Sequence, residues 1–181
     1  MGSKVTFPAV KWIGANAKRF GRGRSGSIKA IVLHTSVGSL SSMDDMFSSA
    51  SPSPDGNTSA HYGIAVDGSV IHQYVKDTDT AFHAGILYLP RAWMVLRAPW
   101  VNPNSYTIGI EHADNAKPDG PRTPGQIAAS VELVYGLCVR YNITPSSQTI
   151  IPHNHIRASK SCPGSLPVAE IIRRVRAKWD A

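Results

Sequence analysis

The sequence predicts a single α/β domain in which helices flank a central mixed β-sheet. Short runs rich in β-branched residues alternate with two amphipathic helices, which is typical of an α/β fold, and a hairpin adds an antiparallel pair to the sheet. The 181 residues suit one domain, and the 42% of hydrophobic residues are enough to build a core. No apolar run approaches the ~18 residues that a membrane span requires.

Three apolar runs predict buried strands. Residues 28–34 (IKAIVLH) form the first, which ends at His34. Residues 106–111 (YTIGIE) and 149–151 form the other two, and the last leads into a histidine-rich segment. Strand ends present side chains to clefts, so His34 is a candidate site residue, although a lone histidine there also suits a structural role.

A hairpin and two loops follow from turn composition. Residues 60–66 and 69–75 flank Asp67-Gly68, and an Asp-Gly pair favours a type I′ turn in which both central residues have positive φ. Residues 51–59 are a loop by composition, and residues 90–103 are expected to form a long apolar surface loop or insertion.

Helices are predicted at three places. Residues 41–49 suit a short helix. Thr123 can cap a second helix, a proline suits its first position, and Gln126 completes a capping box, so this helix is expected to run to about Tyr141. Apolar residues at helical spacing predict a closing amphipathic helix over 168–179, with a solvated basic face.

The charge is basic and unevenly distributed. Nineteen Lys and Arg against 12 acids give a formal net charge of +7, which suggests a polyanionic partner such as nucleic acid, acidic lipid or a cell-wall polymer. The first acid is Asp44, so residues 1–27 form a basic N-terminal extension ahead of a domain over 28–181. This extension is expected to be either a solvated, flexible arm or a segment that docks on an anionic surface.

Residues 152–164 (PHNHIRASKSCPG) carry the strongest chemical signal. They hold His153, His155, Lys160 and Cys162, and imidazole nitrogen and thiolate sulfur are the usual zinc ligands. Together with the strand-terminal His34, this segment predicts a catalytic zinc site with three protein ligands. The other cysteine, Cys138, occupies a core position of the second helix and is expected to be a buried hydrophobe.

The chain resembles the zinc-dependent N-acetylmuramoyl-L-alanine amidases, which share their fold with phage amidase lysozymes and peptidoglycan recognition proteins. The matching segments follow the family's order and cover most of the chain. They are IVLHTS (31–36), SAHYGIAVDGSVIHQYV (59–75), AFHAG (81–85), NSYTIGIE (104–111), the capped helix from Thr123, and IIPHNHIRASKSCPG (150–164).

The resemblance implies a site with one zinc ion per chain, held by His34, His153 and Cys162. It implies that Lys160 stabilises the developing oxyanion and that Glu111 acts as the general base and acid.

The resemblance also implies a substrate groove and includes one departure. His155 stands where the family usually has an acid, so either the surroundings of the metal differ or His155 competes for zinc; we favour His153 as the ligand. The residues expected to line or flank the groove are His83, His61 and Tyr62. Tyr62 is equally compatible with a place in the core.

The implied reaction is zinc-dependent hydrolysis of the amide bond between N-acetylmuramic acid and L-alanine in peptidoglycan, with an endolysin-like role in cell-wall lysis. The alternatives are a non-catalytic peptidoglycan-binding module and a cytosolic amidase that recycles anhydro-muropeptides. A nucleic-acid partner is not expected, because no recognition motif is present.

The expected context is that of a monomer that acts on the wall. Because the N-terminus lacks the apolar stretch of a secretory signal, we expect synthesis in the host cytoplasm and release to the wall by another route. The basic extension is expected to contact an anionic cell-wall or outer-membrane surface.

Overall fold

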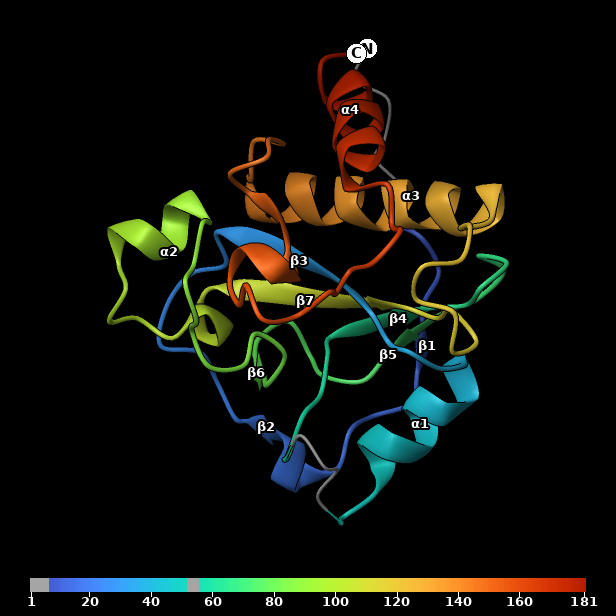
Figure 1. Cartoon of the computed structure of the whole chain (residues 1–181), viewed down its shortest axis with the longest axis vertical. Helices are drawn as coiled ribbons and strands as arrows, with labels where there is room; N and C mark the ends of the chain where they lie inside the picture. The colour runs from blue at the N-terminus through green and yellow to red at the C-terminus, as the bar shows by residue number, and fades with distance from the viewer. Residues whose placement is uncertain (1–6, 52–55) are drawn as a thin grey trace.

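A mixed six-stranded sheet runs through the computed structural model, which describes residues 7–51 and 56–181 (Figure 1). Its strands lie in the order β1 (Lys11–Trp12), β5 (Ile71–Gln73), β4 (Tyr62–Ile64), β7 (Thr107–His112), β3 (Ala30–Thr35) and β8 (Ile150–Pro152). The four neighbouring strands β4, β7, β3 and β8 are parallel to one another. The strand β5 runs antiparallel to β4, and β1 runs parallel to β5. The predicted α/β class with a mixed sheet is confirmed.

Two helices cover one face of this sheet in successive layers. In Figure 1, α3 (Pro124–Tyr141) lies across the sheet and α4 (Val168–Trp179) lies on α3. Alternate strand residues such as Ile31 and Leu33 fill the core beneath α3, where Cys138 is buried as expected. None of the helices within the described residues is long and apolar enough to cross a membrane.

The opposite side of the sheet carries α1 (Leu40–Ser48) and a small antiparallel sheet of β2 (Phe20–Gly21) and β6 (Thr80–Ala81) (Figure 1). The helix α1 confirms the short helix predicted over 41–49 to within a residue.

The second helix begins as predicted but its capping box is incomplete. The hydroxyl oxygen of Thr123 accepts a hydrogen bond from the backbone N–H of Gln126 (3.0 Å). The side chain of Gln126 does not return to Thr123; it donates to the carbonyls of Ala65 (3.1 Å) and Ala113 (2.7 Å). The glutamine therefore ties the start of α3 to the β4 and β7 ends of the sheet.

The hairpin forms between β4 and β5, but the expected type I′ turn is wrong. Gly68 has a positive φ of 75°, whereas Asp67 is not among the residues with positive φ. The N–H of Gly68 donates to the carbonyl of Ala65 (3.0 Å), and Ala65 donates to Val70 (3.0 Å). The loop is therefore longer than two residues, with Val66 and Asp67 at the centre of an ordinary turn and glycine in the left-handed position that follows it.

The loop predicted over 90–103 contains a short helix, α2 (Trp93–Arg97). Its Val95 is fully buried against the sheet face opposite α3, with Ala30 and Val32 of β3. Five residues are too short for helical periodicity to show in the sequence, and apolar residues on both sides of the segment hide its one buried face.

Residues 7–27 of the N-terminal extension are part of the fold, so the expected flexible arm is wrong for them, although Lys11, Lys18 and Arg22 are exposed to solvent as expected. Residues 1–6 lie outside the described residues. Lys11 and Trp12 add the edge strand β1. Arg19 is only 2% exposed, and its guanidinium donates to the carbonyls of Ser49 (2.8 Å), Thr58 (3.1 Å) and Ser51. A cation in this segment therefore fixes a later loop.

Replacing Arg19 by Met is expected to lower the free energy of unfolding by about 3 kcal/mol, because three backbone carbonyl oxygens lose a charged donor. Urea unfolding followed by tryptophan fluorescence measures this change. Arg22→Met is the matched control, since Arg22 is exposed on the same segment. An equal loss in both variants would mean that charge, and not the hydrogen bonds of Arg19, stabilises the segment.

Candidate metal centre and pocket

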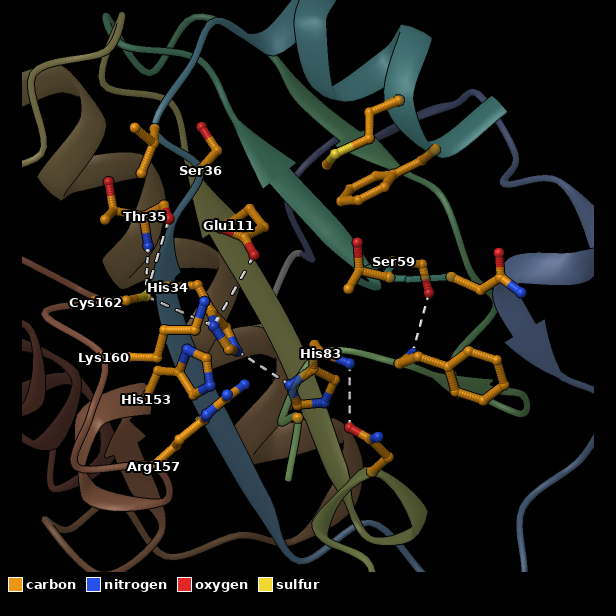
Figure 2. Close-up of a pocket in the computed structure, with 18 of the residues that line it drawn as sticks. His34, Thr35, Ser36, Ser59, His83, Glu111, His153, Arg157, Lys160 and Cys162 are labelled. Atoms are coloured by element: carbon orange, nitrogen blue, oxygen red, sulfur yellow. Dashed lines mark hydrogen bonds and ion pairs between the residues drawn. The ribbon is translucent and has the colours of Figure 1, made fainter. Parts of the chain in front are cut away.

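Three neighbouring parallel strands bring candidate residues to one edge of the sheet (Figure 2). His34, near the end of β3, pairs in register with Glu111 of β7. On the other side, Leu33 of β3 pairs with Pro152 at the end of β8, and His153 follows immediately in the short helix η3 (His153–His155). The carboxyl ends of these strands therefore place all three side chains at one level.

The ligand atoms of His34, His153 and Cys162 all lie within 4.8 Å of one another. Cys162 comes from the loop before α4, and its Sγ lies 3.8 Å from Nδ1 of His34. The backbone N–H of Thr35 donates to the same sulfur (3.2 Å). Two imidazoles and one thiol are ligands that zinc prefers, and three protein ligands leave a fourth position for water or substrate.

Hydrogen bonds define which nitrogen of His34 can bind a metal. The hydroxyl of Thr107 donates its proton to the carbonyl of Pro103 (2.7 Å), so its oxygen accepts from Nε2–H of His83 (3.1 Å). A neutral His83 then has an unprotonated Nδ1, which accepts from Nε2–H of His34 (3.1 Å). This relay leaves the lone pair on Nδ1 of His34, the nitrogen that faces Cys162.

His153 is oriented in the same way. Its Nε2 donates to the carbonyl of Ala84 (3.2 Å), which leaves Nδ1 free as a ligand atom. Its ring lies 4.4 Å from that of His34 between centroids. Both imidazoles therefore turn an unprotonated nitrogen toward one point, as metal-ligating histidines do.

Backbone features hold His83 in place at the centre of the relay. The side-chain oxygen of Asn104 accepts from the backbone N–H groups of His83 (3.1 Å) and Ala84 (2.8 Å). A Cβ at Gly109 of β7 would come within 2.4 Å of the His83 ring. Only glycine at this point of the strand lets the ring lie against the sheet.

Burial keeps the imidazoles neutral. It lowers the pKa of His34 well below 6.5, that of His153 to about 4 and that of His83 to about 3, with neighbouring cationic or imidazole groups adding to the effect of burial. Burial also raises the pKa of the Cys162 thiol, which Glu111 raises further. Metal binding at this group therefore requires the thiol to lose a proton.

The carboxyl group of Glu111 faces the metal-ligating group. Its Oε1 lies 3.9 Å from Nδ1 of His34, and its Oε2 is buried without a hydrogen-bond partner in the described part of the chain. Burial, together with the charge of Asp114, raises the pKa of Glu111 to about 8. Such a carboxyl exchanges its proton near neutral pH, which suits a general base that later acts as an acid.

A pocket of about 650 Å³ opens over these residues. Lys160 and Arg157, from the loop after η3, line one side of it beside Cys162. Figure 2 shows both close to His153, opposite Ser59 and the loop that Arg19 fixes. The pocket therefore combines a metal-ligating group, an acid and two cations.

Two residues expected at the groove lie elsewhere. Tyr62 is fully buried in the core under α3, and its hydroxyl donates to Asp77 (2.7 Å), so its expected place beside the groove is corrected. His61 is also fully buried; its Nδ1 accepts from the N–H of Gly109 (3.0 Å), and its ring lies behind that of His83. Only His83 of this set lines the pocket.

His155 stands apart from the metal-ligating group that the described residues form. Its backbone carbonyl accepts from the N–H groups of Arg91 (2.7 Å) and Ala92 (2.9 Å). His155 therefore holds the loop around Arg91 through its backbone, and the geometry favours His153 as the ligand.

Sequence reasoning did not single out Asn104, Thr107, Thr35 or Arg157. Asn104 precedes β7 and Thr107 begins it, and neither a polar residue before a strand nor a threonine within one carries any sign of a buried histidine across from it. Arg157 could have been found from the sequence, because it is a second cation only three residues before Lys160.

Comparison with known proteins identifies a family that fits this geometry. A family model for N-acetylmuramoyl-L-alanine amidase matches residues 24–165. The chain is also 28% identical over 143 residues to N-acetylmuramoyl-L-alanine amidase A of Achromobacter lyticus, a match that covers 79% of this chain and 69% of that protein.

Two solved structures show the same fold. One is the endolysin N-acetylmuramoyl-L-alanine amidase LysCS from Clostridium intestinale, with a TM-score of 0.64 and 21% identity over 98% of this chain and 99% of that one. The other is the amidase AmiD from E. coli in complex with the substrate anhydro-N-acetylmuramic acid-L-Ala-D-γ-Glu-L-Lys, with a TM-score of 0.60 and 24% identity over 83% of this chain and 59% of that one.

The pKa of Glu111 predicts a pH-dependent stability for the metal-free protein. Because this pKa is about 8 in the folded state and near its ordinary value of 4.5 when unfolded, the folded state binds the proton more tightly. The stability that this gives is complete below pH ~4.5 and is lost as the pH rises through ~8. Glu111→Gln should therefore gain roughly 2–4 kcal/mol relative to wild type between pH ~5 and ~9.

Urea unfolding in the presence of a chelator measures this difference. Glu170→Gln is the control, because Glu170 is an exposed carboxyl on α4 and its replacement should leave the difference from wild type unchanged with pH. A Glu111→Gln difference that is equally flat would contradict the raised pKa.

Proposed function

This chain belongs to the N-acetylmuramoyl-L-alanine amidase family, and we propose that it hydrolyses peptidoglycan with one zinc ion held by His34, His153 and Cys162. The observation that carries the proposal is the convergence of these three ligand atoms within 4.8 Å, with the carboxyl group of Glu111 against them. The reaction breaks the amide bond between the lactyl group of N-acetylmuramic acid and L-alanine.

The donor set supports zinc. Nδ1 of His34 and Nδ1 of His153 are both unprotonated because their Nε2 atoms donate elsewhere. Lys160, Arg122 and the N–H of Thr35 each favour the thiolate form of Cys162. When bound, zinc supplies a Lewis acid that polarises a carbonyl group and makes water easier to deprotonate at neutral pH.

We propose that Glu111 moves the proton. The unpartnered Oε2 accepts a proton from the attacking water as the water oxygen bonds to the carbonyl carbon. The same carboxyl then donates the proton to the leaving nitrogen of L-alanine as the C–N bond breaks. A pKa of about 8 supports both steps, because the group is neither too acidic to accept nor too basic to donate near neutral pH.

We propose that Lys160 stabilises the negative charge that develops on the carbonyl oxygen. It lines the pocket beside Cys162, on the side of the metal-ligating group away from Glu111, with Arg157 close by. A positioned cation acts strongly in a site that excludes most water, and a comparable donor is worth ~3–4 kcal/mol in the transition state.

His83 acts in this proposal as a positioning residue. It contacts His34 and lines the pocket, and its hydrogen bonds to Thr107 and His34 select the tautomer that ligates. This replaces direct substrate binding as its main role.

We propose an endolysin-like role in wall lysis. The similar LysCS structure is of a protein named an endolysin, and the net charge of +7 favours the anionic wall as a partner. The basic N-terminal segment supports this role only indirectly, because the guanidinium groups of Arg19 and Arg24 donate to carbonyl groups within the protein.

Separate replacement of the ligand and the acid tests the function. Wild-type protein is expected to release new L-alanine amino termini from purified sacculi. Cys162→Ala is expected to lose bound zinc and activity, whereas Glu111→Gln should keep zinc and lose roughly 10²–10⁴-fold in activity. Zinc content by mass spectrometry and release of amino termini are the two measurements.

Glu132→Gln, on the outer surface of α3, is the control for a changed carboxyl and should match wild type in both. Absence of release by a zinc-loaded wild type would refute the proposed activity, and a metal-replete, active Cys162→Ala would refute the ligand set. Comparison of sacculi with soluble anhydro-muropeptides distinguishes the roles, because a lytic enzyme prefers sacculi and a recycling enzyme the soluble fragment.

The tautomer relay is testable without activity. Thr107→Val removes the oxygen that accepts from His83, so His34 should populate both tautomers and zinc affinity should fall about 10–100-fold. Ring ¹⁵N shifts report the tautomer in the metal-free protein, and chelator competition reports the affinity. Thr107→Ser restores the hydroxyl and should restore both readouts; if Val and Ser behave alike, the relay does not set the tautomer.

A further inference from the structure

Exposed apolar side chains are concentrated in one lobe of the molecule. Of the ten large hydrophobic residues of the described chain that are strongly exposed, six lie within residues 86–100, which we call the outer lobe. They are Ile86 (77%), Tyr88 (54%), Leu89 (68%), Trp93 (48%), Leu96 (56%) and Trp100 (82%). In Figure 1 this lobe, which contains α2, lies at the left of the view, and its buried residues pack with residues of β3 and β8. Such clustering on a soluble domain marks an interaction site.

The outer lobe is firmly attached, so these side chains are not exposed because the segment is loose. On its inner side Val95 and Ala92 are buried with residues of β3 and β8. Its backbone is hydrogen-bonded to η3 and to the segment that follows. The carbonyl of His155 accepts from the N–H groups of Arg91 and Ala92, and the carbonyl of Tyr88 accepts from Ala158 (2.9 Å). The lobe is therefore a rigid platform that is apolar on both sides.

The backbone also holds one of the exposed side chains in an unfavourable conformation. Leu89 has a φ of 44°, in the left-handed region that a branched apolar residue rarely adopts. The conformation costs free energy, yet the side chain of Leu89 remains 68% exposed. The cost is understandable if Leu89 packs against something outside this chain.

The charge of the lobe selects the kind of partner. No acidic residue occurs between Asp79 and Glu111, whereas Arg91 and Arg97 are both exposed within the lobe. Neither arginine is paired with a carboxylate among the residues that the structure describes. The guanidinium of Arg97 lies 4.9 Å from the centre of the Trp93 ring, so one basic group accompanies an exposed indole.

We propose that the outer lobe docks on the surface of an anionic lipid bilayer. Tryptophans and arginines are the residues that favour the interface between headgroups and acyl chains, and Leu89, Leu96 and Ile86 supply aliphatic groups for the acyl region. The arginines complement the negative headgroups. A sugar polymer would use the indole faces but would leave the aliphatic side chains in water.

The proposed surface lies beside the pocket. Gly85, immediately before the lobe, and Arg157, which forms a β-bridge with Tyr88, both line the pocket. Docking would therefore hold the open side of the pocket close to the bilayer. The proposal concerns lipid binding alone and does not require the hydrolytic activity.

Vesicle binding by the full chain tests the proposal. Wild-type protein is expected to co-sediment with vesicles of phosphatidylethanolamine and phosphatidylglycerol and to bind phosphatidylcholine vesicles weakly. The double variant Trp93→Ser/Trp100→Ser should weaken binding to the anionic vesicles at least about tenfold, as should Leu89→Ser/Leu96→Ser in an independent protein. Arg91→Gln/Arg97→Gln should remove the preference for anionic over neutral vesicles.

Trp12→Ser is the matched control, because Trp12 is 53% exposed on β1, at the opposite edge of the sheet, and its loss should leave vesicle binding unchanged. Circular dichroism and turnover of a soluble muropeptide confirm that each variant is folded. The proposal is overturned if wild type ignores anionic vesicles or if both double variants bind like wild type. It is equally overturned if the lobe variants lose binding to lipid-free sacculi only, or change only the oligomeric state in sedimentation velocity.

Discussion

The parallel pairing of β3 with β7 is the constraint on which the rest of the site depends. Paired residues of parallel strands point to the same face, and His34 pairs with Glu111. Ile31 and Leu33 of β3 point into the core under α3, so alternation sends His34 to the other face. A slip of one residue would bury a histidine and a carboxyl group in an apolar core. Packing against α3 therefore fixes the register, and the register fixes the distance between acid and ligand.

Burial gives this site its chemical character. The same desolvation that keeps His34 and His153 unprotonated keeps Glu111 protonable near neutral pH, so one physical cause prepares ligands and acid together. His112, one residue after Glu111, has both of its ring nitrogens hydrogen-bonded. Its Nδ1 donates to the carbonyl of His34 (2.8 Å), and its Nε2 accepts from Ser130 (2.9 Å). His112 thus supports the ends of β3 and β7 that carry the site.

The spacing of apolar residues predicted those strands and helices that depend on local sequence. The runs that became β3, β7 and β8, the capped start of α3 and the apolar face of α4 could all be read from residue spacing, and so could the grouping of His34 with residues 152–164. What could not be predicted depends on partners distant in sequence. Strands of two residues such as β1 have no periodicity, and Tyr62 belongs to the core because of Asp77 and α3, which no local pattern reveals. Arg19 looked like part of a solvated cationic run, because its acceptors are the carbonyls of a loop 30 to 39 residues away.

The long reach of these N-terminal contacts has a consequence for synthesis. Arg24 contacts the carbonyl of Asn104, 80 residues later, and Arg19 contacts Thr58, 39 residues later. The segment therefore leaves the ribosome well before the carbonyl groups that accept hydrogen bonds from its arginines have been synthesised. During translation these two arginines and the neighbouring cations are solvated and attract polyanions, and Arg24 can turn inward only after the chain up to Asn104 has emerged. The nascent chain thus carries, for a time, a basic arm in which every cation is free, whereas in the finished protein the guanidinium groups of Arg19 and Arg24 are bound within the fold.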